Sequence, residues 1–187
     1  IEHQKSGKIY LNGTDCSDLP IYERSKYYNI SICPQFAGYF FDLTILENLT
    51  AVTEIHIKEK SLRISKIEQI VNQFGLESVL NTPAKICSGG ERKKLSIAMA
   101  IINDPEILLL DEPYAFLDIL SVKMIQEIII NLQSMKNMSI IVTDHNAADL
   151  LKTVDRCLVL ANTKIIAAGS PNDIIRDSNA ITAYFGK

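Results

Sequence analysis

Several features that would indicate other classes of protein are absent from this sequence. Its four cysteines, Cys16, Cys33, Cys87 and Cys157, form no Cys-x-x-Cys pair, which argues against zinc and favours a reducing compartment such as the cytosol. The formal net charge is −3 at pH 7, so no basic excess indicates a nucleic-acid partner. No apolar run approaches the roughly 18 residues that a membrane-spanning helix needs. These absences favour a globular cytosolic protein.

The composition agrees with that interpretation. A length of 187 residues suits one domain with a sizeable core, and 47% hydrophobic with 22% charged residues excludes a disordered chain. We therefore expect residues 1–187 to belong to a single domain.

The clearest functional signal is an apolar run that ends in two carboxylates. Residues 107–110 read Ile-Leu-Leu-Leu and are followed by Asp111 and Glu112. Such a run predicts a central strand of a parallel sheet covered on both faces, and ligands bind at the carboxyl ends of such strands. One carboxylate there can hold Mg²⁺ while the other orients or deprotonates a water. The alternative is a polar turn that merely ends the strand.

A second motif opens a long helical pattern. Ser88, Gly89, Gly90 and Glu91 precede a stretch whose apolar side holds Leu95, Ile97, Ala98, Ile101 and Ile102. Ser88 can cap this helix, and the two glycines leave backbone N–H groups accessible to an anionic phosphate at the positive end of the helix dipole. A plain capped helix is the alternative.

Two further strand-like runs end in polar side chains. Residues 139–143 are β-branched and lead to His145, while residues 30–33 lead to Gln35. A neutral imidazole at His145 can contact a γ-phosphate, although a lone histidine is more often an ordinary strand-end residue. Each of these signals is weak by itself.

Taken together, in this order and spacing, the motifs resemble the ATP-binding domain of ABC transporters over nearly the whole chain. The resemblance implies an α/β fold with a P-loop NTPase-like parallel sheet core, a β-rich N-terminal piece and a helical signature subdomain. It also implies the cofactors ATP and Mg²⁺. The implied site residues are the Q-loop glutamine and metal contact Gln35, the signature residues Ser88, Gly89, Gly90 and Glu91, the Mg²⁺ ligand Asp111, the catalytic Glu112, the D-loop Asp118 and the switch His145.

Two positions depart from the family pattern. Cys87 stands where the signature usually has leucine, and residues 115–118 read Ala-Phe-Leu-Asp rather than Ser-Ala-Leu-Asp. Neither change removes a phosphate contact. The family's partners are a second ATPase subunit, which completes each ATP site, and transmembrane permease subunits, which place the protein at the inner face of the cytoplasmic membrane.

The resemblance divides the domain into three parts. Residues 1–44 form a β-rich part with the Q-loop, residues 45–103 a helical subdomain with the signature, and residues 104–187 the remaining motifs. The helical pattern between 45 and 80 places Leu62, Ile67, Ile70, Val71 and Phe74 near 3.6-residue spacing. The aromatic segment 36–43 would meet the permease, although we expect at least one of Tyr39, Phe40 and Phe41 to be a core residue.

Turn and capping signals predict the secondary structure near the two ends of the chain. The Asn12-Gly13 pair after residues 8–11 predicts a hairpin. Near the end, residues 147–151 predict a short helix, the runs 156–161 and 164–169 predict two strands joined at Asn162 and Thr163, and Ser170 predicts the cap of another helix.

The sequence contains no P-loop. That motif needs Gly-x-x-x-x-Gly-Lys followed by Ser or Thr, whereas Gly7-Lys8 is followed by Ile9 and Gly186-Lys187 ends the chain. In the family the P-loop precedes the part that resembles residues 6–13, and the chain begins without Met. We therefore expect a fragment that lacks the P-loop and is inactive alone, although a short gene product is the alternative.

The residues within and next to the motifs favour one kind of transporter. Residues 111–122 and 143–146 are similar to ATPases of bacterial lipopolysaccharide export. Most ABC ATPases read Thr-His-Asp around the switch histidine, whereas in this chain Asp144 precedes and Asn146 follows it. Branched-chain amino-acid or other importers are the second choice. A soluble ABC protein without a permease, or a non-catalytic regulatory subunit, would be a different class of function.

Overall fold

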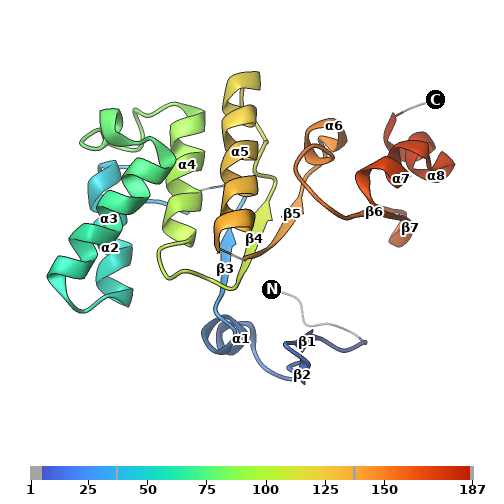
Figure 1. Ribbon diagram of the computed structural model, residues 1–187, viewed down its shortest axis with the longest axis horizontal. Coiled ribbons are helices and arrows are strands. Elements are labelled where there is room, and N and C mark those ends of the chain that lie inside the picture. The colour runs from blue at the N-terminus through green and yellow to red at the C-terminus, as the bar shows by residue number, and fades with distance from the viewer. Residues whose placement is uncertain (1–5, 37, 137, 186–187) are drawn as a thin grey trace.

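The computed structural model describes residues 6–36, 38–136 and 138–185 and has an α/β fold (Figure 1). Its centre is a three-stranded parallel sheet in the order β3 (Ile30–Cys33), β4 (Ile107–Asp111) and β5 (Ser139–Thr143). Cys33 pairs with Leu110 and Leu110 pairs with Val142, so the three strands end at nearly the same level. The expected parallel core is confirmed.

Helices cover one face of this sheet. Leu108 and Leu110 are buried with residues of α4 (Gly89–Ala100) and α5 (Ile119–Lys136) in the main core. On the opposite face Ile32, Leu109 and Ile141 are neighbours in the register, and Ile32 and Ile141 are 61% and 58% exposed. Cover on both faces of β4 was expected. Within the described residues the main core forms on the Leu108 face alone.

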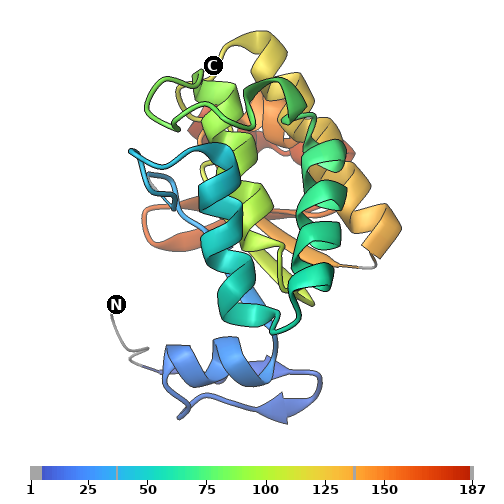
Figure 2. The same ribbon diagram turned by 90° about the vertical axis from the view of Figure 1, so that its left-hand side faces the viewer.

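The helical region consists of two helices and a short turn. Thr44 and Glu47 form a capping box at the start of α2 (Ile45–His56), and α3 (Lys60–Phe74) ends where Gly75 adopts φ 57°. A 3-10 turn, η1 (Glu77–Val79), follows. Figure 2 shows α2 and α3 beside α4. Four of the expected core positions on α3 are buried, but Leu62, in the first turn of this helix, is 56% exposed.

The predicted N-terminal hairpin is present. β1 (Tyr10–Leu11) and β2 (Thr14–Asp15) pair antiparallel across Asn12 and Gly13, both with positive φ. It is followed by α1 (Ile21–Tyr27), which the sequence pattern did not indicate because this helix buries no residue. α5, also not anticipated, is 18 residues long. No helix in the described ranges is both long and apolar enough to cross a bilayer.

The C-terminal part forms a second, smaller core. α6 (Ala147–Leu150) leads to the antiparallel pair β6 (Cys157–Ala161) and β7 (Lys164–Gly169), as predicted. Ser170 and Asp173 form a capping box for α7 (Pro171–Arg176), which is followed by α8 (Ser178–Ala180) and the π-helix η2 (Ile181–Phe185). The buried side chains of this core are Cys157, Val159, Ala167, Ile174 and Ala180.

Candidate functional site

Three of the predicted site residues meet beyond the carboxyl ends of the parallel strands. Gln35 lies two residues after β3, Glu112 directly follows β4, and His145 lies two residues after β5. Because the strands are parallel and in register, their carboxyl ends lie at one edge of the sheet (Figure 1).

Hydrogen-bonding distances join these side chains. Gln35 Nε2 donates to Glu112 Oε2 at 2.6 Å, although the two residues are 77 positions apart. The same Glu112 oxygen lies 3.3 Å from His145 Nδ1. The Glu112 side chain is 30% exposed and that of His145 is 72% exposed, so solvent reaches the cluster from the histidine side. An accessible carboxylate between an amide and an imidazole can accept a proton from water.

The backbone around Glu112 is held in an uncommon conformation. Glu112 has φ 43°, in the left-handed region that non-glycine residues seldom adopt, and its N–H donates to Thr143 O at 2.8 Å. Strain of this kind is concentrated at functional sites. The neighbouring residue Tyr114 donates its N–H to Asp144 Oδ2 at 3.1 Å and its hydroxyl to Thr153 at 2.8 Å. β4 and β5 are therefore tied together directly beyond their ends.

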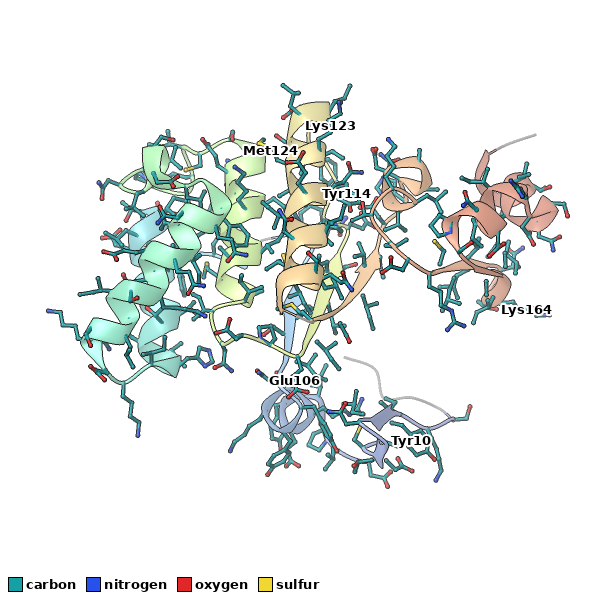
Figure 3. All side chains as sticks on the ribbon, in the orientation of Figure 1. Tyr10, Glu106, Tyr114, Lys123, Met124 and Lys164 are labelled. Carbon is teal, nitrogen blue, oxygen red and sulfur yellow. The ribbon has the colours of Figure 1, made fainter. Side chains whose placement is uncertain are left out.

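Burial disfavours ionisation of the Tyr114 hydroxyl. Desolvation raises the pKa of Tyr114 to about 12, although the hydrogen bond with Thr153 opposes the shift. Figure 3 places Tyr114 between α5 and α6. Its ring packs in the main core and its hydroxyl bonds to the segment after α6, so Tyr114 supports the backbone that carries Glu112.

Asp111 is placed where a magnesium ligand would be needed. It is exposed at the end of β4, and its Oδ1 accepts a hydrogen bond from Thr143 Oγ1 at 2.7 Å. Proteins usually hold Mg²⁺ with one or two carboxylates, while water and substrate phosphates complete the octahedron. Within the described part of the chain no group of three or more acidic, histidine or cysteine side chains could cage a metal alone. An exposed carboxylate with a free coordination side fits this phosphate-dependent kind of site.

The predicted signature residues start α4 as expected. Ser88 Oγ accepts from the Glu91 N–H at 3.3 Å, and Glu91 Oε2 accepts from the Ser88 N–H at 2.7 Å. Glu91 is thus engaged in the cap. Gly90 is buried against α5, where a Cβ would meet Ser121 Oγ at 2.5 Å.

Asp118 lies beside the signature residues. It accepts hydrogen bonds from the N–H groups of Leu120 and Ser121, at 3.0 Å each, and from Ser121 Oγ at 2.6 Å. The hydrogen bonds from Ser121, with its hydroxyl first, lower the pKa of Asp118. Ser121 therefore connects Asp118 with Gly90.

The predicted site residues form two separate groups. Among the described residues, no hydrogen bond or ion pair joins the group of Ser88, Gly89, Gly90 and Asp118 to the group of Gln35, Glu112 and His145. In Figure 1 the first turns of α4 and α5 lie at the top, above the ends of the strands. The structure brings together the catalytic candidates Glu112 and His145 with the Q-loop candidate Gln35 and, elsewhere, the signature and D-loop candidates.

The sequence interpretation did not single out Lys93. This lysine is only 8% exposed, and its Nζ donates to the main-chain carbonyl of Gln35 at 3.2 Å. A lysine beside the apolar side of the α4 pattern was the available signal, since lysine is rarely buried without a specific partner.

The aromatic segment after Gln35 divides into core and surface residues. Tyr39 packs against the main core, whereas Phe40 and Phe41 are 57% and 51% exposed. The buried Asn48 holds this segment, since its side chain accepts from Phe40 N at 2.7 Å and donates to Phe40 O at 3.0 Å. We expected at least one of these aromatics to be a core residue, and Tyr39 comes nearest to this, because it is partly buried against the main core.

Comparison with known proteins identifies the family. The family model described as ABC transporter matches residues 1–115. An uncharacterized ABC transporter ATP-binding protein of Rhizobium meliloti is 34% identical over 96% of this chain and 66% of its own length. The lipopolysaccharide export system ATP-binding protein LptB of Haemophilus influenzae is 35% identical over 98% of this chain and 76% of its own length. The chain thus spans about two thirds to three quarters of these relatives.

Solved structures have the same fold. The cbiO1 protein of Clostridium perfringens, part of an ABC transporter complex, superposes with a TM-score of 0.82 at 21% identity over 96% of this chain and 72% of its own. An ATP-binding cassette of an ABC transporter in its ADP conformation superposes with a TM-score of 0.79 at 22% identity over 98% of this chain and 78% of its own. From the motif order, the family match and the relatives, the chain belongs to the ATP-binding proteins of the ABC transporter family.

Proposed function

We propose that this chain provides the hydrolytic part of an ATPase that powers an ABC transporter. The observation that carries the proposal is the cluster of Gln35, Glu112 and His145 beyond three parallel strands, beside Asp111. In this cluster one carboxylate oxygen contacts both neighbours, which leaves the other oxygen of Glu112 as the group to orient a water. General bases in hydrolytic sites are placed in this way.

Each residue then has a distinct role toward ATP. Glu112 accepts the proton of the attacking water, His145 contacts the γ-phosphate, and Gln35 holds Glu112 through its amide N–H. Asp111, with the amide oxygen of Gln35, would hold Mg²⁺, whose charge offsets that of the phosphates when it is bound. Because Thr143 already bonds one oxygen of Asp111, the carboxylate is oriented before any ligand arrives.

The second group of site residues would act on a different ATP molecule. Ser88, Gly89 and Gly90 lie apart from Glu112, so we propose that they complete the site of a second ATPase subunit, with Asp118 at the contact between subunits. Glu91 supports this group by capping α4. The exposed Phe40 and Phe41 would meet a transmembrane permease subunit, since exposed aromatics are typical of interaction surfaces. The protein would then be peripheral at the inner face of the cytoplasmic membrane.

The transported substrate that we propose is lipopolysaccharide. The named LptB relatives support this choice, including that of Escherichia coli K12, which is 31% identical over 97% of this chain and 75% of its own length. A replacement experiment tests it: the chain, supplied with a P-loop segment ahead of residue 1, should restore growth to bacteria depleted of their own LptB. Normal ATP hydrolysis without restored growth would contradict lipopolysaccharide as the substrate.

Substitution of Glu112 tests the hydrolytic role. In the P-loop-bearing protein, meaning one in which a Gly-x-x-x-x-Gly-Lys-Ser/Thr segment precedes residue 1, Glu112→Gln should lower turnover by about a hundredfold or more and leave ATP binding intact. ATP should then trap a dimer of this variant in size-exclusion chromatography. Glu106→Gln is the matched control, because Glu106 lies at the opposite end of β4 (Figure 3). Near-normal hydrolysis by Glu112→Gln would exclude Glu112 from this role.

A further inference from the structure

Lys93 is a buried cation on the signature helix α4. It is 8% exposed, and Nζ donates to the main-chain carbonyl oxygen of Gln35 at 3.2 Å. No ion pair with an acidic side chain is found for Lys93 in the described part of the chain. A buried charge is costly unless it is paired or hydrogen-bonded, and among the described residues the carbonyl oxygen of Gln35 accepts a hydrogen bond from this ammonium.

The segment around Gln35 rests on the same side of α4. Ser96 is three residues after Lys93, so the two side chains lie on one helix face. Ser96 Oγ lies 3.2 Å from the thiol of Cys33. A Cβ on Gly38 would be 2.8 Å from the same oxygen, and Gly38 has φ +86°. Lys93 and Ser96 therefore contact the turn after β3 at Gln35 and at Cys33, and Ser96 leaves no room for a side chain at Gly38.

We propose that Lys93 is a positioning residue for Gln35. The carbonyl contact fixes the main chain of Gln35, and the Gln35 side chain then reaches Glu112 at 2.6 Å. Lys93 touches neither Glu112 nor His145 through any hydrogen bond or ion pair that the described residues make, so it acts through the Gln35 backbone. Because Ser88 caps α4, Lys93 also connects the helix that carries the signature residues with the Glu112 cluster. This inference rests on the proposed function for the role of Glu112.

Cys33 provides a native reporter for this turn. Its side chain is 1% exposed, and burial raises the pKa of the thiol, whereas the hydrogen bond with Ser96 and the charge of Lys93 lower it. Because the thiol is buried, N-ethylmaleimide can reach it only when the turn after β3 opens, so faster alkylation after substitution of Lys93 reports easier access to Cys33.

The first experiment uses the 187-residue chain and needs no ATP. N-ethylmaleimide labelling of each cysteine is followed by peptide mass spectrometry in Lys93→Met, Lys93→Arg and Lys94→Met. In Lys93→Met, the labelling rate of Cys33 should be about tenfold higher than in the unmodified chain, as expected for loss of one charged hydrogen bond. The labelling rate of Cys157 should stay within about twofold of its rate in the unmodified chain. Lys93→Arg keeps a charged donor, so the labelling rate of Cys33 in this variant should lie within about threefold of the rate in the unmodified chain.

Lys94→Met is the matched control, since it removes the same charge from the adjacent position of α4. The labelling rate of Cys33 should not change in this variant. Equal acceleration at Cys33 and Cys157 would mean general destabilisation and would overturn the proposal, as would an unchanged Cys33 rate. If Lys93→Met does not fold, Lys93→Gln gives the same comparison, because its shorter side chain cannot reach the carbonyl in the same position.

A second experiment separates positioning from ATP binding. In the P-loop-bearing protein, Lys93→Met should lower kcat about tenfold and leave KM for ATP within about threefold, because Lys93 acts on the Glu112 cluster rather than on nucleotide binding. A rise in KM with unchanged kcat would overturn the proposal. If the unmodified protein hydrolyses no ATP, the proposed function fails, while the labelling experiment still decides whether Lys93 holds the turn.

Discussion

The contact between Gly90 and Ser121 gives a sharp test of how the signature helix packs on α5. In Gly90→Ala the new Cβ would lie 2.5 Å from Ser121 Oγ and 3.0 Å from Ser121 Cβ. Ordinary contact begins near 3.4 Å, so the two helices must separate by about 0.9 Å or Ser121 must move. Rotation of the Ser121 hydroxyl does not relieve the clash, because Ser121 Cβ is also too close. The rotation would also break the 2.6 Å hydrogen bond from Ser121 Oγ to Asp118.

The expected magnitude follows from two opposing effects. Overpacking of a close contact costs about 1–3 kcal/mol. Alanine in place of glycine in a helix returns about 0.5–1 kcal/mol. In Gly89→Ala only the second effect applies, because its nearest neighbour would be Leu117 Cδ2 at 3.5 Å. Urea denaturation followed by circular dichroism should therefore find Gly90→Ala less stable than Gly89→Ala by about 1–3 kcal/mol.

A double-mutant cycle identifies the contact responsible. Ser121→Gly removes both clashing atoms and leaves Ser121 Cα at 3.9 Å from the new methyl group. Gly90→Ala combined with Ser121→Gly should therefore be more stable than the sum of the single effects by about 1 kcal/mol or more. Additive effects within about 0.5 kcal/mol, or equal stability of the two alanine variants, would refute the close approach of α4 and α5 at Gly90.

Three further predictions concern surfaces and protonation. Phe40→Asp or Phe41→Asp should weaken co-purification with a permease, while ATP hydrolysis by the isolated P-loop-bearing protein continues. The control is Tyr22→Asp, at an exposed aromatic on α1. Unfolding of both phenylalanine variants would instead show that these two side chains belong to the core. Residues 1–187 alone should neither bind nor hydrolyse ATP in an equilibrium dialysis and phosphate-release assay, since no Gly-x-x-x-x-Gly-Lys cradle is present in them; measurable turnover would refute the P-loop argument. The lowered pKa of Asp118 adds stability above its unfolded pKa near 3.9, which is lost as the pH falls through the lower folded pKa. Asp118→Asn should therefore destabilise the chain more at pH 6 than at pH 2.5 in urea titrations, and an equal effect at both pH values would contradict the assignment.

Local features of this chain could be predicted because they depend on groups only a few positions apart. Ser88 and Glu91, like Ser170 and Asp173, satisfy each other's backbone N–H groups within one helical turn. The turn at Asn12 and Gly13 depends on residues that accept positive φ. The sequence also indicated which strand ends carry polar side chains, because short apolar runs followed by polar residues are typical of strands in a parallel sheet.

Contacts between distant segments were decided only by tertiary structure. The bond from Gln35 to Glu112 joins residues 77 positions apart and depends on the register of β3 with β4, which no local pattern specifies. Leu62 matched the helical spacing yet is exposed, because packing against α2 and α4 selects the buried side of α3. The sequence interpretation did not single out Lys93, which is buried with its ammonium on the carbonyl oxygen of Gln35, 58 positions earlier in the chain. Strand register and helix packing are set jointly by the whole core, so the geometry of the site belongs to the fold rather than to any one motif.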